Sequence, residues 1–248
     1  MKNLGVVSCF WIFLVSFAYC GPAPPIPSEV WPSPVSFTTG TSSLSICDSF
    51  TLACASSSIC PDPIHDALIR YRSIIFFAGD PATAFSSALC ALQVFVDSDV
   101  PLSPSANESY TLNIPADGAP ATLRASTQWG ALRGLESFSQ LIVWAGPDAD
   151  EGTYSITCAP ITIIDFPRFS HRGVLLDTSF NFLTVPRILE VLDSMAVMKA
   201  NILHWHIVDD PAWPMVSLTY PSFTSPGGSG PYAQVATYSI DDQTLIAN

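Results

Sequence analysis

The sequence has few basic residues, few charges of either sign and few histidines. Only 9 of its 248 residues are Lys or Arg, against 21 Asp and Glu, and charged residues make up 12% of the chain. The resulting net charge of −12 would repel a phosphate-rich partner, which argues against nucleic acid as a ligand. This balance favours an acidic, secreted or lysosome-like setting.

Long apolar runs are absent after the first twenty residues. Residues 1–20 carry a basic second residue, an apolar run from Leu4 to Phe17 and the small residue Ala18 near their end. The run is shorter than the roughly 20 apolar residues that span a bilayer, and Pro22 follows it at once. We therefore expect a removed signal peptide over residues 1–20 and no membrane span in the mature chain.

The cysteines are not spaced for a zinc ribbon, because no two of them form a CxxC pair. Cys9 and Cys20 fall in the expected signal peptide. In an oxidising compartment the other five predict one or two disulfides with one thiol left over. Asn107 begins an Asn-Glu-Ser sequon, which predicts N-glycosylation and a surface loop. The five cysteines are Cys47, Cys54, Cys60, Cys90 and Cys158.

Residues 21–164 have the pattern of a small α/β domain. From Gly21 to about Pro61 the sequence is rich in Pro, Ser and Thr, which predicts loops and edge strands rather than one long element. Hydrophobic periodicity then predicts a helix, three strands, a second helix capped by Thr127 and a returning strand. These elements are expected over residues 66–77, 91–96, 110–114, 121–125, 127–142 and 154–164.

The composition changes at residues 165–169, and a β-α-β order follows. Gly173–Asp177 is a continuous apolar run that ends in a carboxylate, which predicts a strand buried on both faces. Thr184 predicts a helix start, residues 202–208 predict the next buried strand, and residues 239–242 predict a further helix start. Polar residues at the carboxyl ends of parallel strands are typical of a (β/α) barrel or a doubly wound sheet.

The stretch NILHWHIVDDPAWP, residues 201–214, gathers polar side chains of several kinds. His204 and His206 fall on one face of a strand because side chains alternate. With Asp209 they could hold a divalent metal, as in metal-dependent barrel hydrolases, yet such a site needs three or four convergent ligands. Only two other histidines exist in the chain. We favour the alternative in which one histidine is hydrogen-bonded inside a barrel and the other contacts a substrate, with no metal or other cofactor.

Asp209 and Asp210 are adjacent, so they cannot flank a scissile bond from opposite sides. The carboxyl pairs of ordinary glycosidases lie roughly 5 to 9.5 Å apart on different elements. We expect one of the two to hydrogen-bond a sugar hydroxyl or to fix a neighbour. Trp205 and Trp213 fit a protein core as well as a platform on which a pyranose could stack.

Three stretches, in the same order and with similar spacing, resemble the signatures of glycoside hydrolase family 20, the β-N-acetylhexosaminidases of the eukaryotic lysosomal or secreted type. The resemblance covers most of the chain, from Val30 through Tyr238. It implies an N-terminal α/β domain over residues 21–164 and, over residues 165–248, the first units of an incomplete (β/α)8 TIM barrel. The three stretches are QWGALRGLESFSQLI, DFPRFSHRGVLLDTS and ILHWHIVDDPAWP.

The resemblance also implies an activity, the release of terminal non-reducing N-acetylglucosamine or N-acetylgalactosamine from glycoconjugates. In the family's substrate-assisted retaining mechanism the substrate's own acetamido oxygen attacks the anomeric carbon. A Glu protonates the leaving oxygen, and the Asp before it orients the acetamido group. That pair follows the fourth barrel strand in the family, so we expect this chain to lack it.

Other expectations rest on the same resemblance. Asp209, His206 and, less firmly, Asp210 match the polar wall of the family's sugar pocket. Cys60 and Cys90 match a disulfide of the family's first domain. The protein is expected to enter the secretory pathway and to end outside the cell or in a lysosome or vacuole, and a full-length form could dimerise.

The sequence departs from the family pattern after the first barrel strand. The family usually has Asp-Thr-Ser-Arg-His there, and the arginine clamps sugar hydroxyls, whereas this chain has Asp177-Thr178-Ser179-Phe180-Asn181. Phe180 cannot donate charge-assisted hydrogen bonds, each worth about 1.5 to 3 kcal/mol. We therefore expect weak sugar binding or a different sugar. The departure motivates a second hypothesis, a catalytically inactive, secreted carbohydrate-binding paralogue or splice product.

Overall fold

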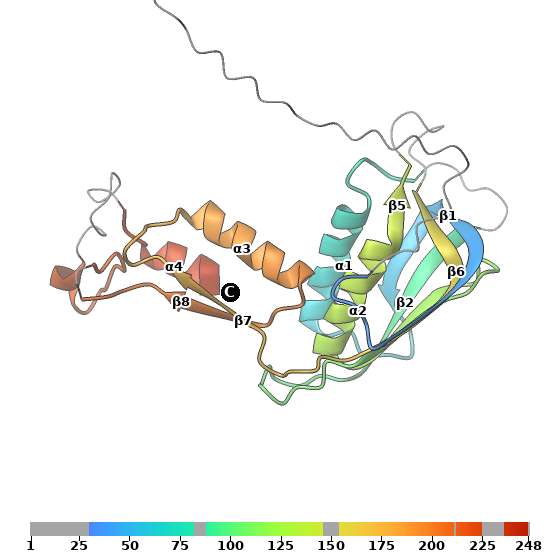
Figure 1. Ribbon diagram of the computed structural model, residues 1–248, viewed down its shortest axis with the longest axis horizontal. Coiled ribbons are helices and arrows are strands. Elements are labelled where there is room, and N and C mark those ends of the chain that lie inside the picture. The colour runs from blue at the N-terminus through green and yellow to red at the C-terminus, as the bar shows by residue number, and fades with distance from the viewer. Residues whose placement is uncertain (1–29, 82–87, 146–153, 211, 225–235, 248) are drawn as a thin grey trace, which may run out of the picture.

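The computed structural model describes residues 30–81, 88–145, 154–210, 212–224 and 236–247, so the predicted signal peptide lies outside the described residues. Figure 1 shows a larger lobe, built on a twisted sheet with helices on one side, and a smaller lobe formed by the last part of the chain. Among the helices of the described segments, none is both long enough and apolar enough to cross a bilayer.

The larger lobe contains one mixed sheet, in which the strands follow the order β1-β2-β4-β3-β6-β5. The prediction of a small α/β layer is confirmed; β3 has the predicted bounds, and β2 and β4 extend a few residues beyond theirs. One short strand, β5, was not predicted. The strands are β1 Ser36–Cys54, β2 Ala88–Ser98, β3 Tyr110–Ile114, β4 Ala121–Thr127, β5 Ile142–Trp144 and β6 Tyr154–Asp165.

The first strand corrects the prediction that residues 21–61 hold no long element. β1 runs for 19 residues because two neighbours share its hydrogen bonds. Its first half pairs antiparallel with β6 from Ser36 to Ser45, and its second half pairs parallel with β2 from Ser45 to Cys54. Gly40 allows the close passage over β6, because a Cβ there would collide with the backbone of Ala159.

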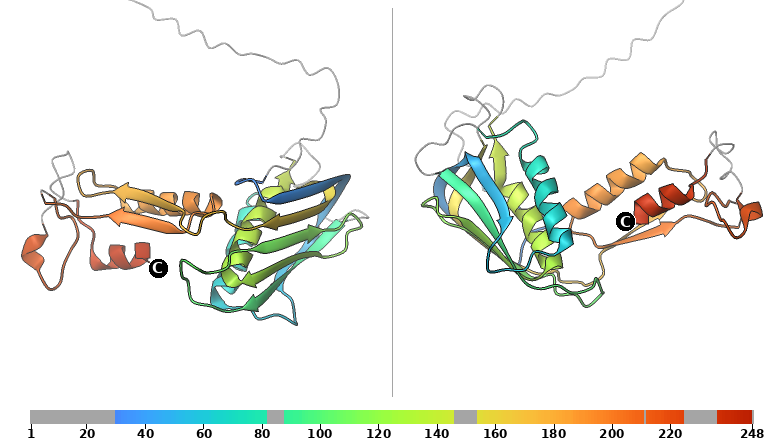
Figure 2. Two further views of the ribbon diagram at one scale, coloured as in Figure 1. Left: turned by 60° about the horizontal axis from the view of Figure 1, so that its bottom comes forward. Right: turned by 180° about the vertical axis from the view of Figure 1, so that it is seen from behind.

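Two helices, α1 Asp62–Ile75 and α2 Gln128–Leu141, cover one face of this sheet (Figures 1 and 2). The predicted cap is confirmed, since the Thr127 hydroxyl accepts a hydrogen bond from the backbone N–H of Gly130 at 3.4 Å. Leu135 and Phe138 are fully buried between α2 and the sheet. Each such side chain stabilises the fold by roughly 1.5 to 3 kcal/mol.

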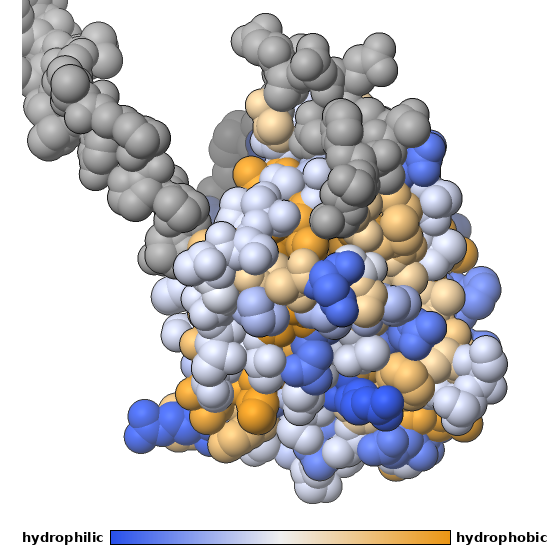
Figure 3. Space-filling model, turned by 90° about the vertical axis from the view of Figure 1, so that its right-hand side faces the viewer, coloured by the Kyte–Doolittle hydropathy of each residue, from blue (hydrophilic) through white to orange (hydrophobic). Residues whose placement is uncertain are grey.

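The opposite face of the sheet carries mainly polar side chains, such as Thr111, Asn113, Thr122 and Arg124, which alternate with the buried ones. Figure 3 shows this side as a surface of mostly pale and blue residues with smaller orange areas. The Arg124 guanidinium lies over the Phe95 ring, 3.9 Å from its centroid. The larger lobe therefore has its core on the helix side only, as a two-layer domain should.

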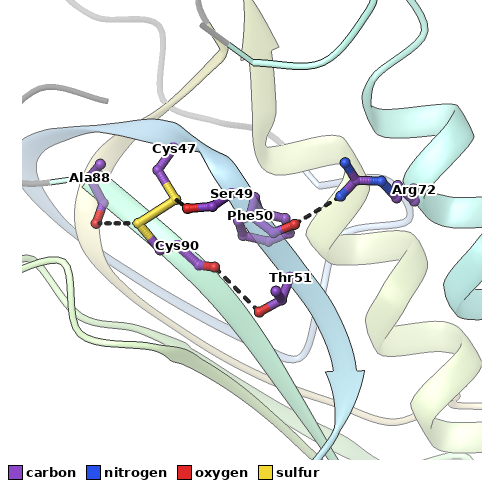
Figure 4. Close-up of a disulfide and its surroundings, with 7 residues drawn as sticks. All are labelled: Cys47, Ser49, Phe50, Thr51, Arg72, Ala88 and Cys90. Carbon is purple, nitrogen blue, oxygen red and sulfur yellow. Dashed lines mark hydrogen bonds between the residues drawn. A yellow bond between two sulfur atoms is a disulfide. The ribbon is translucent and has the colours of Figure 1, made fainter. Parts of the chain in front are cut away.

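Among the described residues, two disulfides and one free thiol confirm the predicted use of the five cysteines, but the predicted Cys60–Cys90 pairing is wrong. Cys90 pairs with Cys47, across β1 and β2, with the two Cα atoms 5.2 Å apart (Figure 4). Cys60 pairs with Cys54, at a Cα separation of 5.9 Å. The long β1 is the reason, because it places Cys47 beside Cys90, while the turn after β1 returns Cys60 to Cys54. The remaining thiol, Cys158, is buried.

The smaller lobe begins as a β-α-β unit, as predicted. Its two strands are parallel and pair in register from Gly173 with Ile202 to Asp177 with His206. Its first helix begins after Thr184, as predicted, although the Thr184 side chain makes no capping hydrogen bond. Its last helix begins after Ser239, whose hydroxyl accepts from the N–H of Asp242 at 3.1 Å. The elements are β7 Gly173–Asp177, α3 Val185–Val197, β8 Ile202–His206, the 3-10 turn η1 Pro221–Phe223 and α4 Ile240–Ala247.

One face of this strand pair is covered and the other is open. Leu176 and Trp205 pack with Ile188 and Tyr238 on the helix side. On the other side Leu175, the partner of His204 in the register, is 60% exposed. The prediction that residues 173–177 are buried on both faces is therefore wrong, because no described element covers the second face.

A buried polar network joins the two lobes. Glu108, from the loop before β3, accepts hydrogen bonds from Arg133 of α2 and from Arg172, which lies just before β7. Lys199, in the turn before β8, forms an ion pair with Asp165 at the end of β6, with Nζ and Oδ2 3.1 Å apart. These contacts fix the amino-terminal ends of β7 and β8 against the larger lobe.

Candidate functional site

The predicted site residues lie where β7 and β8 end, on the open side of the strand pair. Asp177 is the last residue of β7 and is paired in the register with His206, the last residue of β8. The Thr178 N–H donates to the His206 carbonyl at 2.9 Å and joins the two strand ends. Parallel strands thus present their carboxyl ends, and the loops that follow, at one edge.

A tight turn holds the Asp177 carboxylate after β7. Its Oδ1 accepts hydrogen bonds from the Ser179 hydroxyl at 2.8 Å and from the Ser179 N–H at 2.9 Å. These two bonds hold the pKa of Asp177 below its ordinary value, and the bond from the Ser179 hydroxyl has the larger effect. The nearby His206 lowers the pKa further. Asp177 is thus kept ionised at the strand edge, fully exposed to solvent.

The loop after β8 presents the two predicted aspartates. Asp209 forms a bridge with Ala212 through N–O distances of 2.8 and 3.1 Å, and one of its carboxylate oxygens lies 3.7 Å from His206 Nε2. Its other oxygen accepts from the Asp210 N–H at 2.7 Å. The Asp210 side chain is exposed. The structure therefore brings Asp209 and His206 together and places Asp210 at their outer side.

His204 and His206 project from the same face, as predicted, with ring centroids 6.4 Å apart. Within the described parts of the chain no three His, Cys, Asp or Glu side chains converge closely enough to hold a metal ion. His65, on α1, is paired with Asp66, and His171 lies beside Gly173. The histidine pair thus gains no third ligand from these residues.

Three aromatic side chains flank the site in different ways. Trp205 faces the helices and donates its indole N–H to the Thr178 hydroxyl at 2.8 Å, which places it in the core. Phe180, at the position of the missing arginine, is 45% exposed in the loop after Ser179. Trp213 packs edge-on against Phe223 of η1, with centroids 5.7 Å apart.

Sequence reasoning missed two members of this site, Asp177 as a paired carboxylate and Ser179 as its donor. The signal was present, because a carboxylate that ends a buried run and is followed two residues later by Ser is typical of a side-chain-to-backbone turn. The Asp177 position beside His206 depends on strand register, which the sequence alone does not fix.

The arrangement suits binding of a neutral polyhydroxylated ligand better than covalent chemistry. Two carboxylates and an imidazole offer acceptors and one donor at the carboxyl ends of parallel β/α strands. The aspartates of one loop do not oppose each other across a cleft, so they supply no acid and nucleophile pair. Fold and site together define the class as an α/β protein whose smaller lobe starts with a parallel β-α-β unit and carries polar side chains at the ends of its two strands.

Comparison with known proteins supplies the family. Residues 169–248 match the glycosyl hydrolase family 20 catalytic domain, and residues 30–141 match the domain described as beta-acetyl hexosaminidase like. The chain therefore belongs to glycosyl hydrolase family 20, whose members are glycoside hydrolases.

Curated relatives and solved structures agree with this assignment. The chain is 42% identical to beta-hexosaminidase subunit beta of Sus scrofa over 190 residues, and this match covers 74% of this chain and 34% of that protein. It is 34% identical to beta-hexosaminidase 1 of Arabidopsis thaliana, over 89% of this chain and 42% of the relative. A chitobiase structure from Flavobacterium johnsoniae matches with a TM-score of 0.68 and 25% identity, over 86% of this chain and 31% of that one.

A second structure, of a Streptomyces plicatus N-acetyl-beta-hexosaminidase in complex with Thio-NAglucal, shares the fold with a TM-score of 0.65 at 23% identity. It is matched over 91% of this chain and 44% of its own length. The chain spans about a third of the length of the first curated relatives that it matches.

Proposed function

We propose that this chain provides the first domain and the opening barrel strands of a β-N-acetylhexosaminidase. Asp209 and His206, with Asp210 beside them, form part of the wall that holds a terminal N-acetylglucosamine or N-acetylgalactosamine. The observation that carries the proposal is the cluster of Asp177, His206 and Asp209 at adjacent carboxyl ends of β7 and β8. The match of both lobes to domains of one hydrolase family supports it.

In this proposal the chain's own residues bind and orient the sugar and do not break its bond. The substrate's acetamido oxygen acts as the nucleophile, and the Asp and Glu that assist it have no assignable position among the 248 residues. Carboxylates such as Asp209 accept hydrogen bonds from sugar hydroxyls, and these bonds are charge-assisted.

The secretory pathway is the proposed route, with an extracellular or lysosomal destination. Two disulfides support it, because disulfides persist in oxidising compartments. Asn107 is exposed in its loop, and its Oδ1 accepts from the Ser109 N–H at 2.9 Å, so the proposed glycan would project from the surface.

A hydrolysis assay tests the proposal that the residues of this chain bind the sugar but do not break its glycosidic bond. The purified 248-residue chain is expected to release no nitrophenol from 4-nitrophenyl N-acetyl-β-glucosaminide above the rate of the blank. Clear turnover by the pure chain would overturn the assignment of catalysis to other residues.

The role of Asp209 is tested in the product of the complete transcript. Asp209→Asn should lower kcat/KM by about 10- to 150-fold, the equivalent of one charge-assisted hydrogen bond of about 1.5 to 3 kcal/mol. The matched control is Asp48→Asn, which makes the same carboxylate-to-carboxamide change at an exposed position of β1 and should leave kcat/KM unchanged. Equal kcat/KM for Asp209→Asn and the parent would remove Asp209 from the site.

The second candidate function is sugar binding without hydrolysis, and Phe180 favours it. Its exposed ring stands beside the Asp177 turn where a guanidinium would add hydrogen bonds. For a binding protein, titration with N-acetylglucosamine should show saturable binding by the chain, and Phe180→Arg should tighten it about tenfold. No binding at millimolar sugar would count against this candidate.

A further inference from the structure

A cavity lies between the two lobes, at the opposite ends of β7 and β8 from Asp209. It has a volume of about 280 Å³. Arg172 and Lys199, which come just before the two strands, belong to its wall, together with residues of both lobes. The lining also includes Pro32, Ser33, Val35, Glu108, Tyr110, Arg133, Asp165, Phe166, Pro167, Arg168, Phe169 and Met198.

This interlobe cavity concentrates positive charge in an acidic protein. Of the 8 Lys and Arg among the described residues, 4 line it, whereas of the 17 Asp and Glu among them only 2 do so. The basic residues are Arg133, Arg168, Arg172 and Lys199, and the acidic ones are Glu108 and Asp165.

The two carboxylates are fully occupied by protein donors. Glu108 Oε2 accepts from Arg133 and Arg172, and its Oε1 accepts from Asn201 at 3.4 Å. Asp165 Oδ2 accepts from Lys199 Nζ at 3.1 Å, and its Oδ1 accepts from the N–H of Val35 at 3.2 Å. Neither carboxylate therefore needs a cation from outside.

Two of the guanidinium groups keep unused donors. Arg133 donates a hydrogen bond from Nε to Glu108 at 2.7 Å, and within the described residues its two Nη atoms have no hydrogen-bond partner. Arg168 is exposed and lies near the Phe169 ring, 5.4 Å from its centroid, and the described segments provide no carboxylate partner for it. An Arg fork of this kind recognises a carboxylate or a phosphate.

The rest of the wall is mainly apolar. Val35, Phe166, Phe169 and Met198 all line the cavity, and Phe166 and Phe169 are 51% and 64% exposed. Large exposed aromatic side chains beside free cationic donors favour a ligand that combines an apolar body with an anionic head. A bare inorganic anion would leave the aromatic surface in contact with water.

We propose that the interlobe cavity binds a small organic carboxylate with an aromatic or aliphatic body. The carboxylate is held by Arg168 and the free Nη donors of Arg133, and the body contacts Phe166 and Phe169. The cavity lies at the amino-terminal side of the barrel strands, where residues serve stability rather than chemistry. The ligand is therefore a stabiliser that ties the two lobes together, not a substrate.

Thermal unfolding of the purified chain tests the proposal, with benzoate as the probe and benzyl alcohol and inorganic phosphate as controls at constant ionic strength. Benzoate at about tenfold excess over its Kd should raise Tm by about 3 to 6 °C, and the two controls should leave Tm unchanged. Arg168→Ala should weaken benzoate binding about tenfold in calorimetry, because it removes a charge-assisted contact but no contact of the buried network.

Arg187→Ala is the matched control, since it removes the same charge from exposed α3. It should leave benzoate binding unchanged. The proposal is overturned if benzoate at about 20 mM gives no shift. It is also overturned if phosphate or benzyl alcohol stabilises equally, or if Arg187→Ala and Arg168→Ala weaken binding by the same factor.

Discussion

Lys199 donates three side-chain hydrogen bonds from the smaller lobe to the larger one. Its Nζ donates to the Tyr110 hydroxyl at 2.9 Å, to the Ser137 hydroxyl at 2.8 Å and to Asp165 at 3.1 Å. Burial lowers its pKa, and Asp165 opposes that shift. Its backbone has φ +55°, in the left-handed region, so the surrounding contacts hold a conformation that a lysine rarely adopts.

Lys199→Met should lower the free energy of unfolding by about 3 to 5 kcal/mol, because it leaves the Asp165 carboxylate partly buried without a cation. Chemical denaturation by urea measures the change. Arg187→Ala, which removes an exposed pair with Glu190, should cost less than about 1 kcal/mol. Similar losses for the two variants would contradict a special role for Lys199.

Two buried tyrosines should make the fold sensitive to alkali. Burial, reinforced by the Glu136 carboxylate, raises the pKa of Tyr71, and burial also raises that of Tyr110. In the unfolded chain both phenols ionise near pH 10. A raised folded-state pKa gives stability that is present below that pH and lost as the pH rises above it.

The free energy of unfolding should therefore fall steadily from about pH 10 upward. Tyr71→Phe should reduce the slope of this fall, whereas Tyr220→Phe should not, because Tyr220 is 59% exposed. Urea titrations at a series of pH values provide the slopes. A slope that Tyr71→Phe leaves unchanged would show that Tyr71 does not contribute.

At this scale the sequence identifies residue types but not their partners. Asp209 and His206 could be selected because they match the family's pocket wall, and alternation placed His204 and His206 on one face. Arg172 and Glu108 could not be paired in advance, since they lie 64 positions apart and meet only once both lobes have formed. The same holds for Asp177 and His206, which are joined by strand register.

At the scale of elements, the Cys47–Cys90 disulfide joins the middle of β1 to the start of β2 (Figure 4). The Thr51 hydroxyl also donates to the Cys90 carbonyl at 3.4 Å, and Arg72 of α1 donates to the Phe50 carbonyl at 2.8 Å. The bridge therefore stabilises the part of β1 that α1 packs against.

The two disulfides should differ in their effect on stability because they close loops of different length. The Cys47–Cys90 bridge spans 43 residues and the Cys54–Cys60 bridge spans 6. Loop-closure entropy predicts a loss of about 4 kcal/mol for the double Ala variant of the first pair and about 2 kcal/mol for the second. Guanidinium denaturation of both variants measures the difference, and an equal loss would contradict the loop-length explanation.

Elements with strong periodicity or clear caps were predicted well. Residues 110–114 and 173–177 are strands with the predicted bounds, and Thr127 caps α2 as expected. β1 was missed because its Ser and Thr residues resemble a loop, and its length comes from two neighbours that lie far along the chain. The incorrect disulfide pairing has the same origin.

At the scale of the whole molecule, the two lobes differ in how well their surfaces are covered. The larger lobe has a continuous core under α1 and α2, whereas β7 and β8 form a two-stranded sheet with an open face. Isolated two-stranded sheets are marginally stable, and open edges favour association.

Limited proteolysis of the purified chain should therefore cut the smaller lobe first and leave a resistant core that ends near residue 165. Mass spectrometry of the products gives the boundary. A stable core that extends through the second half of the chain would contradict this difference between the lobes.

The central claim is that this chain forms the opening part of a family 20 β-N-acetylhexosaminidase. The most direct measurement is to sequence the transcript beyond the codon for Asn248. The account predicts that the reading frame continues into further β/α units, with an Asp-Glu pair after the fourth barrel strand. A stop codon directly after Asn248 would contradict the claim and would favour sugar binding without hydrolysis.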